Sequence, residues 1–200
     1  MKKGILLLTA ILLISFPFYG QTVYLSAMKV TELNPKPNIA INNHKEKIFL
    51  LIDENNIQDD FVAPAQNGTP KTKISKWHTS LIKGFNNGFG EFFTIVDDPS
   101  QADFILKLSK MDMEWMAASY KTVVSGGGGL SNQSSTSPNS FRAQITFKAQ
   151  LINNHDGEIM KQCAATAVAK KVATRSKEVN PATASALESV YEIIAKDLFE

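Results

Sequence analysis

The chain of 200 residues has little of several features that mark large functional classes. Its one cysteine, Cys163, excludes an intramolecular disulfide, so the fold must be stabilised by an ordinary hydrophobic core. Lys and Arg together number 21 and Asp and Glu number 19. A surface that binds nucleic acid or an anionic membrane normally carries a clear positive excess, so nucleic acid is not expected as a partner.

Recognisable catalytic and cofactor motifs are also missing. His44, His78 and His155 show no His-x-x-x-His spacing, and no Gly-x-Ser-x-Gly sequence occurs. The run Gly126–Gly129 is not followed by the Lys and Ser or Thr that a phosphate-binding loop requires. The sequence therefore predicts no catalytic, cofactor-binding or metal-binding residues, and we expect no enzyme activity and no cofactor.

What the chain does contain begins with a leader. Lys2 and Lys3 precede an apolar run over residues 4–14, and residues 15–20 include a proline and small residues. This order predicts a secretory signal peptide over residues 1–20, whose apolar run is too short for a typical membrane span. We expect cleavage near Gln21, which leaves no integral membrane segment and 19 charges of each sign. The expected location is the periplasm, with an extracellular or signal-anchored protein as alternatives.

The remaining chain divides into a lead-in segment, residues 21–46, and a single α+β domain, residues 47–200. The apolar run over residues 47–53 predicts a strand buried on both faces. Strict alternation of apolar and polar residues over 141–151 predicts an antiparallel strand with one wet face, and Asn153 to Gly157 has the composition of a hairpin turn.

Two helices follow from apolar residues spaced three and four apart. The first would carry Ile74, Trp77, Leu81, Phe85 and Phe89 on one face and stop at Gly88 and Gly90. The second would be capped by Asn180, begin at Pro181, and bury Leu187, Val190, Tyr191, Ile194 and Leu198. The expected fold is therefore α+β, a mainly antiparallel sheet with two helices packed on one face.

A change of parity marks one strand. Its apolar positions run through Phe104, Leu106 and Leu108 and then shift to Met111 and Met113. Successive side chains of a strand point to opposite faces, so a shift of one residue predicts a β-bulge between the two sets.

Asp112 and Glu114 lie two apart on the same strand and would share one face. Two carboxylates can divide the roles of acid and base, which suggests an exported hydrolase as the alternative function. The simpler interpretation places both on the solvated face opposite Met111 and Met113. Cys163 is expected to be a packed side chain rather than a reactive thiol.

Residues 125–140 are predicted to form a flexible Gly- and Ser-rich loop between two antiparallel strands. They include six serines, four glycines and no charged residue. Such a loop either contacts a partner or is a neutral insertion. The residues predicted for a partner contact are Gly126, Gly127, Gly128, Gly129 and Leu130.

The stretches 48–53, 88–90, 93–96, 102–106 and 151–157 are core and turn positions. They resemble those of a known group of small α+β envelope proteins, the YajG-type lipoproteins, and more distantly those of the periplasmic domain of curli-channel subunits. The resemblance implies an accessory or assembly protein of the cell envelope and transfers no catalytic residue. Position 21 is Gln rather than the cysteine that accepts a lipid anchor. We therefore expect a non-enzymatic periplasmic protein that binds a protein partner of the envelope, with a second copy of this chain as one candidate.

Overall fold

The computed structural model describes residues 28–42, 44–64, 71–125 and 133–200, which contain eight strands and two α-helices. The first strands are β1 (Met28–Val30), β2 (Lys47–Ile52), β3 (Phe61–Ala63), β4 (Thr72–Ile74) and β5 (Thr94–Ile95). The later strands are β6 (Phe104–Ser125), β7 (Gln133–Asn153) and β8 (Ile159–Val168). The helices are α2 (Trp77–Phe89) and α3 (Val179–Phe199), and the short 3-10 turns are η1 (Pro99–Gln101) and η2 (Ser176–Glu178).

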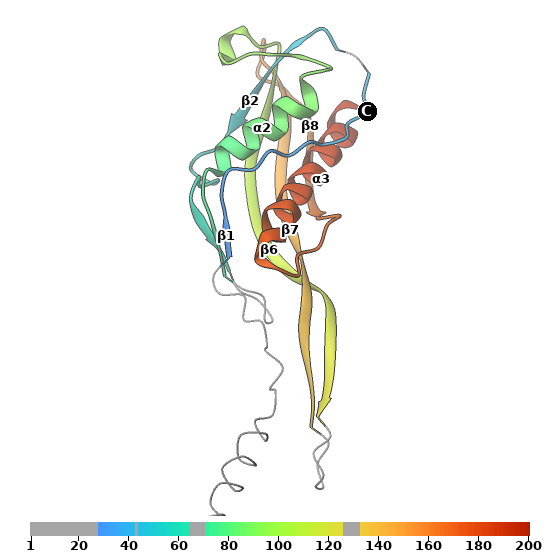
Figure 1. The fold of residues 1–200 in the computed structure, drawn as a ribbon. Coiled ribbons are helices and arrows are strands. Elements are labelled where there is room, and N and C mark those ends of the chain that lie inside the picture. The colour runs from blue at the N-terminus through green and yellow to red at the C-terminus, as the bar shows by residue number, and fades with distance from the viewer. Residues whose placement is uncertain (1–27, 43, 65–70, 126–132) are drawn as a thin grey trace, which may run out of the picture.

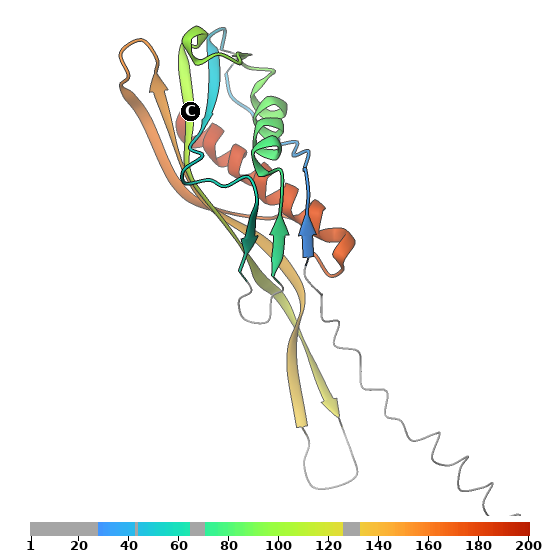
Figure 2. The same cartoon turned by 90° about the vertical axis from the view of Figure 1, so that its left-hand side faces the viewer.

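These strands form two sheets, and both helices lie on one face of the larger one, which confirms the α+β fold (Figures 1 and 2). The large sheet has the order β5-β2-β6-β7-β8 and the small one β1-β4-β3. β2 runs parallel to both β5 and β6, and β1 runs parallel to β4. The long pairings of β6 with β7 and of β7 with β8 are antiparallel, so the predicted antiparallel character is confirmed, but the sheets are mixed rather than purely antiparallel. Two neighbouring strands can run parallel only if a long connection joins them, and the segment that contains α2 is such a connection between β2 and β6.

Helix α3 packs on the sheet through the apolar face that its sequence pattern predicted. Leu187, Val190, Tyr191, Ile194 and Leu198 are all buried in the core. The helix starts at Val179, however, and not at Pro181, so Asn180 lies inside the helix and is not its cap, because η2 leads directly into it. Pro181 lies in the first helical turn, where a backbone N–H has no intrahelical acceptor, so proline costs no hydrogen bond there.

Helix α2 buries Trp77, Leu81, Phe85 and Phe89 as predicted. Ile74 is buried too, but it belongs to strand β4 and not to the helix. Gly88 does not stop the helix: a Cβ there would lie 2.7 Å from side-chain atoms of Pro37 and Ile39. The absence of a side chain allows the segment before β2 to pass close to α2, and the helix ends one residue later at Phe89.

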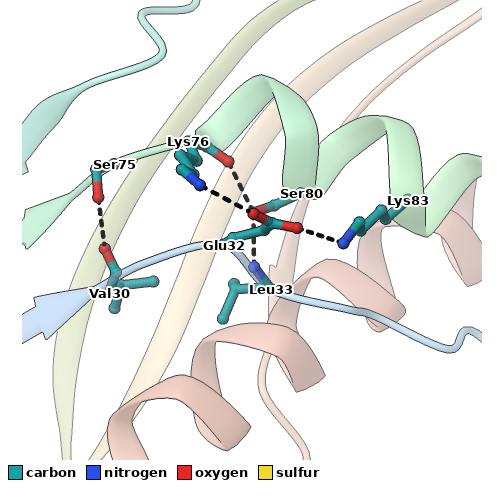
Figure 3. A network of polar contacts seen from close by, with 7 residues as sticks. All are labelled: Val30, Glu32, Leu33, Ser75, Lys76, Ser80 and Lys83. Atoms are coloured by element: carbon teal, nitrogen blue, oxygen red, sulfur yellow. Dashed lines mark hydrogen bonds and ion pairs between the residues drawn. The ribbon is translucent and has the colours of Figure 1, made fainter.

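That earlier segment was expected to lead into the domain, and from Met28 onward it is part of it. β1 pairs with β4, and Leu33 is buried. Figure 3 shows how the segment is held on the start of α2: the Leu33 amide donates to Ser80 Oγ at 2.9 Å, and Glu32 forms ion pairs with Lys76 and Lys83. Hydrogen bonds from these two lysines lower the pKa of Glu32.

Two local features of the long strands follow the sequence pattern closely. The β6–β7 register shifts between Leu108 and Lys110, which is where the parity change predicted a β-bulge. The hairpin from β7 to β8 closes with Gly157 at φ 74°, in the left-handed region that glycine tolerates. Within the described ranges, neither helix combines the length and the apolar character needed to cross a membrane.

Candidate functional site

The predicted contact residues, Gly126 to Gly129 and Leu130, lie outside the part of the chain that the structure describes. The prediction of a loop over all of residues 125–140 is wrong, because Ser125 is the last residue of β6 and residues 133–140 belong to β7. The correction has a simple reason. Pairing of two strands uses backbone N–H and C=O groups, which a Ser- and Thr-rich segment supplies as well as an apolar one.

The paired residues beyond the body form a two-stranded ribbon that we call the arm, residues 118–125 and 133–140. β2 pairs with β6 only up to Leu108, and β8 pairs with β7 only from Gln144 onward. Beyond the Ala117–Phe141 pair, the described strands of the arm pair only with each other. Eight residues per strand correspond to about 26 Å. Figure 2 shows the arm projecting away from the helices and the rest of the sheet.

Several polar side chains of the arm make contacts between its two strands. Ser119 Oγ hydrogen-bonds to Asn139 Oδ1 and Ser140 Oγ, and Thr122 Oγ1 lies 3.2 Å from Thr136 Oγ1. The Tyr120 side chain is 60% exposed. Such pairs link the two strands, and among the side chains that are described the arm presents polar atoms and one large aromatic ring to its surroundings.

Asp112 and Glu114 share the outer face of β6, opposite the buried Met111 and Met113, as the simpler interpretation predicted. Lys110 Nζ lies 2.8 Å from Asp112 Oδ2, and Gln144 Nε2 donates to Glu114 Oε1 at 2.9 Å. Each carboxylate therefore has a neighbouring donor on this face. An ion pair at a solvated surface contributes at most about 1 kcal/mol.

A groove of about 570 Å³ adjoins these carboxylates, and no sequence pattern indicated it. One wall is β6 from Lys110 to Glu114, and the other is β3 with Pro64. Asn55, Asn56 and Gln58, from the connection between β2 and β3, line the groove as well. Its volume is within the usual range for ligand sites. No local motif could have revealed it, because its walls are about fifty residues apart in the chain.

The three histidines do not line this groove. His44 stacks on Phe93 with ring centroids 4.6 Å apart, His78 hydrogen-bonds to the Ile57 carbonyl, and His155 is in the hairpin turn. In the described part of the chain, no three His, Cys, Asp or Glu residues are grouped in a way that could hold a metal ion.

Cys163 is buried on β8, which confirms it as a packed side chain. Burial and, to a smaller extent, the charge of Asp197 raise the pKa of its thiol to about 11. The thiolate is the nucleophilic form of cysteine, so this thiol is unreactive near neutral pH.

No protein-family model and no curated protein matches this chain. Among solved structures, a Xanthomonas campestris protein of the DUF330 family is 12% identical, with 84% of this chain and 93% of that chain covered, at a TM-score of 0.47. Uncharacterized lipoprotein B from Nitrosomonas europaea is 10% identical, with coverages of 79% and 84% and a TM-score of 0.44. A minor lipoprotein from Acinetobacter baumannii is 10% identical, with coverages of 77% and 90% and a TM-score of 0.38. Similarity at this level assigns neither a family nor a function.

Proposed function

We propose that this chain is an exported, non-enzymatic accessory or assembly protein of the cell envelope, and that it works in the periplasm by binding a protein partner through its arm. The observation that carries the proposal is the arm itself: two long strands leave the body of the domain and pair only with each other among the described residues. The leader over residues 1–20 supports export.

The physical argument starts from the cost of such a ribbon. A two-stranded ribbon is marginally stable in water, because it buries little apolar surface, and it adds little to the stability of the domain. Both of its outer edges carry backbone groups that another strand can pair with. Proteins usually protect such edges with charged residues or proline, but the arm has Lys121 as its one charge and Pro138 as its one proline. With so few protecting residues, the outer edges of the arm favour backbone pairing with a strand of a partner.

The test places a photo-crosslinking amino acid in the full-length chain, expressed in its native host, at Tyr120 of the arm. Met160 on β8 is the matched control, since it is 50% exposed and lies on the body. We expect one discrete crosslinked protein from position 120 and none from position 160. Equal crosslinking from the two positions, or none from position 120, would refute binding through the arm.

A second variant separates binding from folding. Replacing residues 118–140 with Asn-Gly closes the ribbon at the Ala117–Phe141 pair with a two-residue turn. The shortened chain should melt at nearly the same temperature as the full chain and lose the partner. Retention of the partner by a folded, shortened chain would contradict the proposal.

Export is tested by intact-mass analysis of the cell fractions. The product should begin near Gln21 and leave the periplasm with osmotic shock. A product that keeps Met1 and stays with the membrane would contradict cleavage.

An exported hydrolase is the second candidate, favoured by the groove that touches both Asp112 and Glu114. Ester, peptide and glycoside substrates would be incubated with the mature chain, with the Asp112→Asn variant and with the Glu114→Gln variant. Hydrolysis that both variants abolish would establish the enzyme and replace the proposal above. Absence of turnover by the mature chain would leave the binding protein as the better account.

A further inference from the structure

Apolar side chains form a row on the face of the large sheet that points away from both helices (Figures 1 and 2). Leu106 is buried on the helix side, so its neighbour Ile105 points to the opposite, outer face. Directly paired residues of neighbouring strands share a face. The register pairs Phe49 with Ile105, Ile105 with Ile152, and Ile152 with Ile159. These four side chains form the outer row, which spans about 14 Å across β2, β6, β7 and β8.

The outer row is left partly exposed by the described part of the chain. Ile159 is 49% exposed, and Leu51, which lies two residues beyond the row on β2, is 38% exposed. The other three members of the row are half-buried, and none of them packs against the core. β2 and β6 run parallel, and parallel strands are normally covered on both faces. The apolar run over residues 47–53 predicted such double burial, but the helices cover only one of its faces.

Positive charge lies beside the outer row. Lys107 is paired with Leu51 and shares the outer face with it. Lys148 lies directly opposite Lys110 in the pairing of β6 with β7, and like charges placed in this way repel each other. Lys110 has an acidic partner, Asp112, at 2.8 Å. Within the described ranges, neither Lys107 nor Lys148 forms an ion pair. These two lysines therefore favour an anion on this face.

A hollow of about 340 Å³ lies next to Lys148. Ser109, Gln150 and Gln162 line it as well, whereas no described residue of either helix does, so it opens on the outer face. Ammonium, amide and hydroxyl groups can all donate hydrogen bonds to a carboxylate. Gln150 is two residues from Ile152 on β7, so the hollow begins about 7 Å from the outer row. An apolar surface and a site for an anion thus adjoin each other.

We propose that the outer row and this hollow form a docking surface for an acidic amphipathic helix of a protein partner, separate from the arm. The helix lays its apolar stripe on the row and places an Asp or Glu carboxylate in the hollow beside Lys148. Three turns of helix are about 16 Å long, which matches the row. α3 already packs on β7 and β8 from the opposite face. The docked helix gives the sheet a second helical layer.

The charges of the surface favour this occupant over a second copy of the chain. A second copy would bring the same two lysines. Its carboxylate nearest to the row is that of Asp103, which already accepts a hydrogen bond from the Lys47 amide at 2.7 Å. A bilayer is disfavoured for a different reason. Side chains that bind a membrane reach into its acyl boundary, whereas three members of the outer row are half-buried in the sheet.

The experiment uses two synthetic helical peptides with the same leucine stripe. One carries Glu along the flank of the stripe, and the other carries Lys at the same positions. Each is titrated into the isotope-labelled mature chain, and binding is followed by NMR. The acidic peptide should bind at least about tenfold more tightly, with amide shifts confined to residues 49–51, 105–109, 148–152 and 159–164. Equal affinities, no binding, or shifts centred on the helices or the arm would overturn the proposal.

Charge-reversal variants test the role of the lysines. Lys107→Glu combined with Lys148→Glu should weaken the acidic peptide at least about tenfold and strengthen the basic one. Lys177→Glu combined with Lys196→Glu makes the same change of net charge at exposed positions of η2 and α3, and it should leave both affinities unchanged. Equal effects of the two double variants would mean that net charge alone attracts the peptide. Melting shows whether each variant is folded, and the exposed Lys148→Glu alone should still reduce the preference.

A second pair of variants tests the apolar contact. Leu51→Ser should weaken the acidic peptide about threefold, because it removes an apolar side chain beside the row. Val62→Ser is the matched control, since Val62 is 58% exposed on β3, and it should have no effect. Equal effects of the two substitutions would contradict the position of the helix.

The other occupants give distinct results with the same variants. Dimerisation in sedimentation velocity that Leu51→Ser abolishes would assign the surface to a second copy and overturn the proposal. Binding to phosphatidylglycerol vesicles that the Lys107 and Lys148 double variant loses would assign it to a membrane and overturn the proposal as well. The chain shortened to Asn-Gly at residues 118–140 should bind the acidic peptide with unchanged affinity. The arm and the outer row can therefore succeed or fail separately.

Discussion

The body of the domain and the arm are built from the same two strands, β6 and β7, but stabilised in different ways. In the body, these strands carry Leu106, Phe147 and other buried side chains that α3 covers with Leu187 and Ile194. In the arm, Ser119 contacts Ser140 and Thr122 contacts Thr136 across the ribbon through their hydroxyl groups. The comparison shows that pairing alone can continue a strand, whereas stability requires a covered apolar face.

The sharpest test of this contrast removes a core side chain. Leu187→Ala should lower the free energy of unfolding by about 2 to 5 kcal/mol, because the fully buried leucine leaves a cavity between α3 and the sheet. Thermal and denaturant melting of the mature chain measure the change. Lys196→Ala on the exposed side of the same helix is the control and should change stability by less than about 0.5 kcal/mol. Equal stability of the two variants would mean that α3 does not dock on the sheet.

The next effect concerns the contact between the two helices. A Cβ at position 84 would lie 2.6 Å from Cε2 of the Tyr191 ring. Gly84→Ala should therefore destabilise the body by about 1 to 3 kcal/mol, although alanine is the better helix former. Asn86→Ala, on the exposed face of α2, is the matched control and should be neutral or slightly stabilising. A more stable Gly84→Ala variant would show that the helices are packed less closely than the structure indicates.

A smaller effect is expected from one buried hydrogen bond. The Tyr191 hydroxyl donates to the Leu81 carbonyl at 2.7 Å, and burial raises the pKa of this tyrosine. Tyr191→Phe keeps the ring but leaves that carbonyl without the donor, so about 1 kcal/mol of stability should be lost. Denaturant melting measures it. An unchanged midpoint would indicate that the carbonyl finds another donor.

The arm should give the smallest effect. Thr122→Ala removes the 3.2 Å contact with Thr136 but exposes no apolar surface and leaves no buried polar group unsatisfied. Its change in unfolding free energy should stay below about 0.5 kcal/mol. Hydrogen exchange should at the same time quicken at the amides around position 122. A loss of stability comparable to that of Leu187→Ala would mean that the arm belongs to the cooperative core.

Several elements could be predicted because they depend on neighbouring residues. The alternation over residues 141–151, the shift of parity around Ser109 and the spacing of Leu187, Tyr191 and Ile194 each reflect the geometry of one strand or helix. The structure confirms all three. The resemblance to YajG-type lipoproteins, the leader and the role of Gly126 to Leu130 stay predictions.

Other elements could not be predicted, because their partners are distant in the chain. β1 pairs with β4, which follows it by about forty residues, and no pattern of three residues could identify that partner. The strands of the arm have no apolar alternation, so a Ser-rich composition suggested a loop instead. Asp112 and Glu114 were identified as neighbours, but the groove beside them exists only because β3 lies next to β6.

The sequence by itself determined the class of fold, the apolar faces of both helices and the outward position of the carboxylates on β6. Those properties follow from the periods of single elements, 3.6 residues for a helix and two for a strand. Tertiary structure alone decided that the segment from Met28 onward packs on α2, that β6 and β7 extend beyond the body, and that β3 lies across one groove from β6. These depend on contacts between segments that are distant in the chain, many of them through backbone groups that are the same in nearly every residue, so the periodicity of a single element does not reveal them.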